Sequence, residues 1–342
     1  MTIPSEDDRI DAYLWDAAAP PDDAVRQAEQ RLGALRFDPV RTPLLWPAPA
    51  PAVVGHRRRW LYGLAAAVVI IAAGWSLAEW RLSWPAGRAW TMAATPASLP
   101  ERLAVGSTLT LPASESARVN IARIGTMQVQ GDARMTLEFT QQGRHRLALE
   151  RGTVRVRVWA PPGSVVVRTP AGDVIDLGCA FDLTADADRS IVRVRSGWVQ
   201  LDNPIGESLV PAGAVSEMLT DRAPGVAVFE DASPDFQAAV RALEASANPD
   251  VAALVRVILA QARPRDVLTL LLLIDRGAPG RDQFAARAAG LFPPPAGVTA
   301  NGVLRGDRDG LWRWRDSLPL PPAKSWIRNW RDGLPAWLSG RN

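Results

Sequence analysis

An uncharged stretch from Trp60 to Ala78 constrains this chain more than any other feature of its sequence. It reads WLYGLAAAVVIIAAGWSLA, which is 19 residues without a charged side chain. A helix needs about 20 mostly apolar residues to cross about 30 Å of hydrocarbon, and buried core helices seldom stay uncharged for so long. Aromatic residues that prefer headgroup depth lie toward its two ends, namely Trp60, Tyr62, Trp75, Trp80 and Trp84. The stretch predicts a single transmembrane helix over residues 60–80.

The charges on either side of this stretch predict its orientation. Arg57, Arg58 and Arg59 directly precede it. The charges after it, which begin with Glu79 and Arg81, are sparser and mixed in sign. Cytoplasmic flanks carry the excess of basic residues, and the stretch begins too late for a cleaved signal peptide, which occupies about the first 15–30 residues. We therefore expect a single-pass protein of the bacterial inner membrane, with residues 1–59 in the cytoplasm and the C-terminal bulk in the periplasm.

The counts of cysteine and histidine limit the chemistry that the chain can perform. Cys179 is the only cysteine, and His56 and His145 are the only histidines, so a structural zinc site of paired Cys and His ligands is excluded. The G-x-S-x-G, Walker, H-E-x-x-H and C-x-x-C motifs are also absent from the sequence. His145 lies in an Arg-rich strand, and we expect it at the surface. We therefore predict a binding protein rather than an enzyme, with no catalytic residue, metal site or cofactor.

Residues 1–38 form a short acidic head before the membrane. Pro21, Asp22 and Asp23 mark the start of a helix, and apolar residues then fall on one face. The candidate contacts with a cytoplasmic partner are Trp15, Val25, Leu32 and Leu35. The head is too short to close a core of its own, so it is either a docking segment that folds on a partner or a loosely ordered solvated tail. Residues 39–59 are a Pro-rich linker that ends in the arginine collar.

Between residues 100 and 220 the hydrophobic pattern changes to a period of two. The run VRVRV (154–158) is one example, and Gly, Pro and Asp interrupt such runs every 8–12 residues or so. A Gly-x-apolar-x-apolar theme recurs at irregular spacing, at Gly125, Gly152 and Gly197. The pattern predicts an all-β region built as a roll or as a solenoid-like stack.

Three segments of this region carry a more specific pattern. They are VVVRTPAGDVIDLGCAFDL (165–183), IVRVRSGWVQL (191–201) and LVPAGAVSEM (209–218). A Thr-Pro pair precedes a Leu-Gly-x-x-Phe element, a Val-x-Val strand runs up to a glycine, and a late Ala-Gly pair follows. In order and spacing these pieces resemble the FecR-like periplasmic domain of iron-dicitrate-type sensor proteins, over about a third of the chain. The matching positions are Thr169, Pro170, Gly178, Cys179, Phe181, Gly197 and Gly213.

The resemblance implies a transmembrane signalling protein of the kind often paired with an extracytoplasmic-function sigma factor. Its periplasmic region would receive a signal from a periplasmic or envelope protein, and its cytoplasmic head would hold or assist the sigma factor. The head in this chain is shorter than the anti-sigma domain usual in the family. The residues leave one alternative open, a non-signalling envelope scaffold with a FecR-like domain, in which the head is only a tail.

Two features of the β region each allow a functional and a structural interpretation. Cys179 stands where the family commonly has threonine, and some relatives cut themselves at this Gly-Thr junction. Self-cleavage at Gly178–Cys179 and simple burial of a small residue are therefore both open. Arginines on the strands form either a surface for anionic partners or the solvated face of half-buried strands. These are Arg144, Arg146, Arg151, Arg155, Arg157, Arg168, Arg193 and Arg195. We do not expect nucleic acid as a partner, because no aromatic residues interleave these arginines.

Residues 233–292 predict an all-α region of helical hairpins. Ser233-Pro234 and Asn248-Pro249 are good helix starts, and LTLLLLI (268–274) is too short to span a bilayer, so it predicts a buried core helix. Residues 293–342 form a Pro/Trp-rich tail that either clasps this region, which we favour, or lies against the membrane or a partner surface. The whole prediction is a mixed, multi-domain chain with a single transmembrane helix, an all-β FecR-like periplasmic domain and an all-α C-terminal helical-hairpin region.

Overall fold

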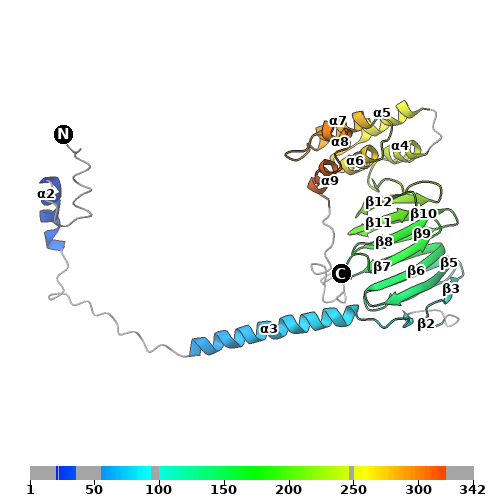
Figure 1. The fold of residues 1–342 in the computed structure, drawn as a ribbon, viewed down its shortest axis with the longest axis horizontal. Helices are drawn as coiled ribbons and strands as arrows, with labels where there is room; N and C mark the ends of the chain where they lie inside the picture. Colours follow the sequence, from blue (N-terminus) through cyan, green and yellow to red (C-terminus); the bar gives the residue numbers. More distant parts are fainter. Residues whose placement is uncertain (1–20, 22, 36–54, 94–99, 246–249, 321–342) are drawn as a thin grey trace. The chain divides into compact units, whose positions relative to one another are not determined.

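The computed structural model of the chain describes residues 21, 23–35, 55–93, 100–245 and 250–320, with side chains in the long helix described from Ala66 onward. The chain divides into two compact units, Met1–Ile70 and Ile71–Asn342. The first contains the short helix α2 (Asp23–Leu32), followed by η1 (Gly33–Leu35), and α3 (Gly55–Leu82) runs from the first unit into the second (Figure 1). No helix among the described residues combines the length and the apolarity needed to cross a membrane.

The β region of the second unit contains 14 strands in the described chain. They are β1 (Trp90–Ala93), β2 (Arg102–Leu103), β3 (Thr108–Leu111), β4 (Ser116–Ile121), β5 (Gly125–Gln141), β6 (Arg144–Val158), β7 (Val165–Thr169), β8 (Gly172–Asp176), β9 (Ala180–Ala185), β10 (Arg189–Ser196), β11 (Trp198–Asn203), β12 (Gly206–Pro211), β13 (Ala214–Leu219) and β14 (Val228–Phe229). The predicted limits of 100 and 220 therefore leave out β1 and β14. Both of these strands are short, and neither shows enough alternation to be recognised in the sequence.

The long hairpin of β5 and β6 belongs to two layers at once. The first half of β5 pairs with β4, and the second half of β6 pairs with β9, which leads on to β10, β13 and β14. The other halves pair with β3 and with β7, which leads on to β8, β11 and β12. Of these pairs only β6–β7 is parallel. Antiparallel neighbours of this kind form a roll, whereas the coils of a solenoid would pair in parallel, so the roll is the correct half of the prediction.

A local bend lets the hairpin pass from one layer to the other. The β5–β6 register shifts between Gln130 and Arg134, and Gly131 and Asp132 there both have positive φ, at 44° and 26°. Opposite them Gly152 has φ +105°, and a β-carbon at this position would lie 2.5 Å from Ala133 Cα. A bulge of this kind bends and twists a strand. Gly152 therefore marks the corner of the roll rather than a repeat of stacked turns.

One apolar core runs through the β region and the helices that follow it. Along the strands buried and exposed residues alternate, as in β10 and β13, so each layer turns one face inward. The core cluster extends from Trp84 to Leu318 and includes Phe181, Phe236 and Trp314. Because the same cluster contains residues of strands and helices, the predicted β and α regions pack as one body.

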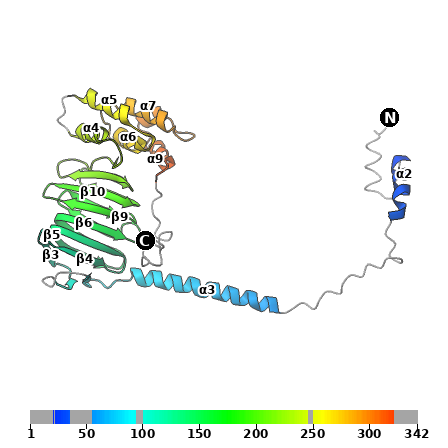
Figure 2. The ribbon, with the colours of Figure 1, turned by 180° about the vertical axis from the view of Figure 1, so that it is seen from behind.

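The helical region lies at the end of the roll where β11 and β12 are found (Figures 1 and 2). Its described elements are α4 (Pro234–Glu244), α5 (Val251–Gln261), η2 (Pro264–Asp266), α6 (Val267–Asp275), α7 (Arg281–Leu291), α8 (Ala300–Leu304) and α9 (Arg308–Ser317). Ser233 caps α4 as predicted, by accepting a hydrogen bond from Phe236 N. Helix α5 is capped by Asp250, while Asn248 and Pro249 lie outside the described residues. Helix α6 contains the run LTLLLLI and is buried along that whole run, as expected of a core helix.

The first part of the predicted tail is folded. Two short helices, α8 and α9, begin at capping residues Thr299 and Asp307, whose side chains accept hydrogen bonds from Gly302 N and Gly310 N. Trp314 on α9 is fully buried, and its indole Nε1 donates to Phe292 O at 3.0 Å. Through this contact the part of the tail that the structure describes, up to residue 320, holds the helical region as predicted. Trp326, Trp330 and Trp337 lie outside the described residues.

Candidate functional site

The C-terminal end of α3 is fixed to the roll by Arg123. This residue stands in the turn between β4 and β5, and its Nη1 donates to the carbonyl oxygens of Trp80 and Ser83, each at 2.9 Å. Its guanidinium carbon also lies 4.2 Å from the centre of the Trp80 ring. The last carbonyls of a helix lack partners within the helix and carry partial negative charge. The guanidinium of an arginine donates hydrogen bonds and carries positive charge, so Arg123 is a suitable cap for this helix end.

Tryptophan and arginine side chains surround this contact. The guanidinium carbon of Arg123 also lies 5.6 Å from the centre of the Trp84 ring, and that of Arg88 lies 4.9 Å from the same ring centre. The Trp84 indole donates to Arg88 O at 3.0 Å, and Arg81 lies 5.7 Å from the Trp159 ring centre. Each such contact contributes about 0.5–1 kcal/mol where it is exposed and more where water is excluded. We call Trp80, Arg81, Trp84, Arg88, Arg123 and Trp159 the junction cluster.

Backbone hydrogen bonds strengthen the same junction. Gly143 N donates to Leu82 O at 3.2 Å, and Gly87 N donates to Thr140 O at 2.9 Å. Gly143 and Thr140 lie at or next to the β5–β6 turn, and Leu82 and Gly87 lie at or just after the end of α3. The helix end is therefore held against the hairpin that joins the two layers. The sequence located the aromatic and basic residues near this end, but it gave no sign that Arg123, some 40 residues later, would hold it.

His145 is buried beside Trp90 and Thr140, which corrects the expectation that it would be a surface residue. It is 2 % exposed, and its Nδ1 lies 2.7 Å from Thr140 Oγ1. The same hydroxyl accepts a hydrogen bond from the Trp90 indole at 3.0 Å. Burial lowers the pKa of His145 from 6.5 to about 4. The imidazole is therefore neutral at physiological pH and belongs to the core.

The FecR-like positions lie at turns and in the core of the roll. Thr169 ends β7; its hydroxyl donates to Gly172 O and accepts from Ser190 Oγ, at 2.9 and 2.8 Å. Pro170 follows in the β7–β8 turn. Phe181 is fully buried on β9. Gly213 has φ +80° in the turn before β13, beside the guanidinium of Arg265. These positions therefore form turns or fill the core of the roll.

Gly178 and Cys179 form a tight turn packed against Gly197. Gly178 has φ +87°, and Cys179 N donates to Asp176 Oδ1 at 2.8 Å. A β-carbon on Gly197 would lie 2.5 Å from Gly178 O. The Cys179 sulfur is buried and lies 2.5 Å from Asp176 Oδ1. The peptide bond between Gly178 and Cys179 is therefore packed between Asp176 and Gly197. Cys179 itself is a small buried residue of the core.

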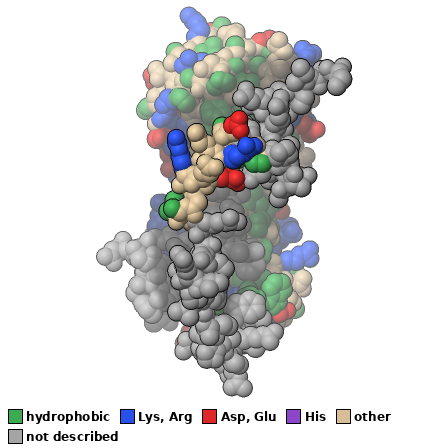
Figure 3. All heavy atoms as spheres, turned by 90° about the vertical axis from the view of Figure 1, so that its left-hand side faces the viewer, with side chains coloured by type: hydrophobic (Ala, Val, Ile, Leu, Met, Phe, Trp, Pro, Cys, Tyr) green, Lys and Arg blue, Asp and Glu red, His purple; other side chains and the backbone are tan. Residues whose placement is uncertain are grey.

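Five of the eight arginines singled out on the strands form ion pairs with acidic residues. Arg155 stands opposite Asp182 and contacts it at 2.8 Å, and Arg195 contacts the same carboxylate. Burial alone would raise the pKa of Asp182, but hydrogen bonds and charge from these two arginines lower it below its usual value. Arg151, Arg168 and Arg193 have similar partners. Because each of these arginines lies beside a carboxylate, the solvated-face interpretation is the correct one for these pairs. Figure 3 shows blue and red side chains next to each other on one face of the molecule.

The candidate contacts of the head lie on one short helix, as far as they are described. Val25 and Leu32 belong to α2 and Leu35 to η1, and no residue of either element is buried. Leu32 is 59 % exposed and Leu35 is 80 % exposed. Trp15 lies outside the described residues. Among the residues that the structure describes, no group of three or more Asp, Glu, His or Cys side chains could hold a metal ion.

Comparisons with known proteins give only partial matches. No family model matches the chain, and no curated protein matches it. Two crystal structures of candidate anti-sigma factors from Parabacteroides distasonis are similar to part of it. One is 20 % identical with a TM-score of 0.30, covering 39 % of this chain and 63 % of that one. The other is 18 % identical with a TM-score of 0.31, covering 45 % and 73 %. No conclusion about function is drawn from scores of this size.

Proposed function

We propose that the chain is a single-pass signal-transducing protein of the bacterial inner membrane, of FecR-like type, which regulates a cytoplasmic sigma factor. The membrane part of this proposal rests on the sequence, namely the uncharged stretch from Trp60 to Ala78 and the three arginines before it. The signalling part rests on the FecR-like pattern of residues 165–218. In this proposal the roll and the helical region are periplasmic, and the head is cytoplasmic.

The observation that best supports signalling is the fixation of α3 by Arg123. Its two hydrogen bonds to the end of the helix, together with the backbone bonds of Gly87 and Gly143, attach this end of the helix to the roll. A rotation or tilt of the roll is therefore passed directly to the helix. A plain tether would need no such contact, because a polar linker would serve equally well.

A periplasmic partner would act by shifting the population of two arrangements of the protein. A ligand can do so only by binding one arrangement more tightly than the other. The exposed leucines of α2 and η1 provide an apolar surface for the sigma factor, and a change in helix position would alter its availability. The scaffold alternative assigns no role to these leucines.

The first experiment examines topology in the full chain. A fluorescent protein that matures only in the cytoplasm is fused to residue 1, and alkaline phosphatase, which is active only in the periplasm, is fused after residue 342. Both reporters should be active in the same membrane fraction. An inactive N-terminal reporter, or a native protein that washes from the membrane with carbonate, would contradict the proposed topology.

The second experiment examines the head. Membranes containing the full chain are used to capture sigma factors from the native cytoplasm, with identification by mass spectrometry. The triple variant Trp15→Asp, Leu32→Asp, Leu35→Asp should lose at least tenfold of the captured sigma factor. The control Ile205→Asp alters an equally exposed apolar residue of the roll and should capture as much as the wild type. Equal capture by the triple variant, or no sigma factor in any sample, would favour the scaffold.

A further inference from the structure

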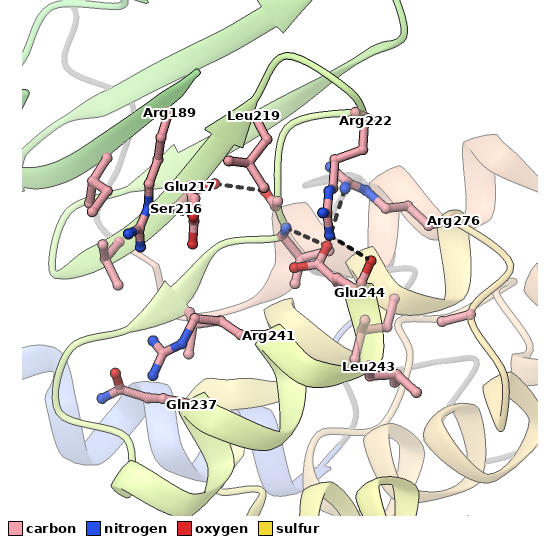
Figure 4. A pocket seen from close by; sticks show the side chains of 18 of the residues that line it. Arg189, Ser216, Glu217, Leu219, Arg222, Gln237, Arg241, Leu243, Glu244 and Arg276 are labelled. Atoms are coloured by element: carbon pink, nitrogen blue, oxygen red, sulfur yellow. Dashed lines mark hydrogen bonds and ion pairs between the residues drawn. The ribbon is translucent and has the colours of Figure 1, made fainter. Parts of the chain in front are cut away.

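A cleft of about 610 Å³ lies between the roll and the helical region. One wall is the outer face of β10 and β13, and the other is formed by α4 and the end of α6 (Figure 4). Pockets for single small molecules in proteins usually measure about 300–1,000 Å³ and lie where two parts of a fold meet. The cleft has this size and this position. It is well separated in the fold from the junction cluster, which lies at the opposite end of the roll.

The floor of the cleft is apolar. Ile191 on β10 and Val215 and Leu219 on β13 line it, and all three are only partly buried, whereas the residues on the other face of these strands are buried. Leu243 on α4 and Leu273 on α6 face the same space. Apolar side chains left partly open in a concave surface lose contact with water when a ligand covers them, which favours binding.

The closed end of the cleft is a rigid polar wall. Glu244 accepts a hydrogen bond from Val226 N at 2.9 Å and forms an ion pair with Arg276 at 3.2 Å. Arg222 Nη1 lies 3.4 Å from the Glu244 carbonyl oxygen. Burial raises the pKa of the Glu244 carboxyl, and the same burial lowers that of Arg276. Because these groups already have hydrogen-bond and charge partners in one another, we expect ligand specificity to depend on the residues at the open end.

The open end has an excess of positive charge. Five arginines and three glutamates line the whole cleft, and without the closed-end group of Glu244, Arg222 and Arg276 three arginines and two glutamates remain, an excess of one positive charge. Arg189 and Arg193 are paired with Glu217 and Glu230, at 2.5 and 3.1 Å. Arg241 on α4 is exposed and has no ion pair or side-chain hydrogen bond to any residue that the structure describes. In Figure 4 Arg189 and Arg241 stand on opposite sides of the cleft, at the end away from Arg276.

We propose that this cleft binds a small amphipathic anion, with its apolar body on Ile191 and Val215 and its carboxylate or phosphate on Arg241, the open-end arginine that no described carboxylate pairs. Guanidinium groups recognise planar and tetrahedral oxyanions through paired N–H donors. The volume fits a molecule rather than a protein segment, and the apolar floor excludes a bare inorganic anion as the preferred ligand. The inference goes beyond the proposed function, because binding here does not depend on the topology of α3 or on a sigma factor.

Three naphthalene derivatives of nearly equal shape test the proposal. The full chain in phosphatidylcholine nanodiscs is titrated calorimetrically with 1-naphthoate, neutral 1-naphthamide and cationic 1-naphthylmethylammonium; if the chain proves soluble, the same titrations are run without lipid. We expect 1-naphthoate to bind at least fivefold more tightly than the amide and the cation not to bind. Equal affinity for acid and amide, or no binding of 1-naphthoate, would overturn the proposal.

Two variants locate the binding. Arg241→Gln should weaken 1-naphthoate at least fivefold and leave 1-naphthamide unchanged, and Ile191→Trp should weaken both by filling the floor. Arg118→Gln, which removes an exposed arginine of β4 that does not line the cleft, is the matched control and should bind as the wild type does. Thermal unfolding of each variant establishes that it is folded. Unchanged 1-naphthoate affinity in Arg241→Gln would overturn the assignment even if Ile191→Trp failed to fold.

Discussion

Gly197 can approach the Gly178 carbonyl because it has no side chain. A methyl group there would meet the oxygen at 2.5 Å, and φ is +75°. The sequence singled out this glycine through the FecR-like pattern and through the theme it shares with Gly125 and Gly152. It could not show the reason, because the close approach joins two segments from different strands. The glycine in the FecR-like sequence pattern thus corresponds to a position where only glycine fits against the neighbouring backbone.

The energetic weight of this contact can be measured with two substitutions. Gly197→Ala should lower the free energy of unfolding by about 2–4 kcal/mol, from the positive φ and from the clash together. Gly143→Ala is the matched control, because φ is +65° there but no atom lies within 4 Å of the new β-carbon; it should cost only about 1 kcal/mol. Chemical denaturation of both variants gives the difference. Equal losses would mean that the close approach has no cost.

His145 illustrates a signal that was present in the sequence and not used. It lies two residues before Leu147 and four before Leu149, so the period of two places it on their buried face. The neighbouring Arg144 and Arg146 favoured a surface position instead, since histidine among arginines is usually solvated. At this position the alternation of buried and exposed residues was a better guide to burial than the charged residues nearby.

Burial of His145 predicts a pH dependence of stability. Its pKa is about 4 in the folded chain and about 6.5 when unfolded, so the unfolded state binds more protons between these values. Its contribution is complete above pH 6.5 and is lost as the pH falls toward 4, at up to about 1.4 kcal/mol per pH unit. His145→Gln should flatten the unfolding free energy over that window, whereas replacing the only other histidine, His56→Gln, should not. A wild-type stability independent of pH from 6.5 to 4.5 would refute the assignment.

At the scale of elements, most strands and helices followed from the sequence, while the long bent hairpin and the last two helices did not. The alternation in VRVRV and the run LTLLLLI indicated their elements directly. The bend of β5 and β6 depends on tertiary structure, because this one hairpin contributes strands to both layers. Gly131, Asp132 and Gly152 lie at the bend, but the sequence did not show that they formed one. Helices α8 and α9 were missed because prolines and tryptophans suggested an irregular tail; Thr299 and Asp307 were the available capping signals.

The junction cluster predicts a local effect of removing Arg123. Arg123→Met keeps an apolar stem against the Trp80 ring but removes both hydrogen bonds to the end of α3. Hydrogen bonds to a charged donor contribute about 1.5–3 kcal/mol, so the amide of Ser83 should exchange with deuterium at least tenfold faster. Arg118→Met, an exposed arginine on β4, should leave exchange at Ser83 unchanged. Equal protection in the two variants would show that the backbone bonds alone hold the helix.

At the scale of the whole molecule, the shared core makes the roll and the helical region one folding unit. The sequence suggested separate regions because its hydrophobic period changes from 2 to 3.6 near residue 230. Period reports local structure and carries no information about which faces meet. The contact is specific: the buried Thr269 of α6 donates to Ala227 O at 2.7 Å, across the boundary between the two regions.

Loss of that hydrogen bond should therefore be felt by both regions. Thr269→Val leaves the Ala227 carbonyl without its donor, and we expect about 1–3 kcal/mol of destabilisation. Thr110→Val, at an exposed position of β3, should change stability by less than about 0.5 kcal/mol. Tryptophan fluorescence and far-ultraviolet circular dichroism should follow a single coincident transition in wild type and variant. Two separate transitions would show that the regions fold independently.

The hairpin shared by the two layers also bears on the order in which the chain acquires its structure during synthesis. Its two strands are neighbours in sequence, so they can pair as soon as Val158 has emerged, without waiting for distant segments. The later strands then find the free edge of β6 already formed, and β7 pairs with its first half before β9 pairs with its second half. The helices come last and cover a finished surface. A ribosome-bound chain ending near residue 200 should accordingly already protect β5 and β6 from protease, while a chain ending before Arg144 should protect neither.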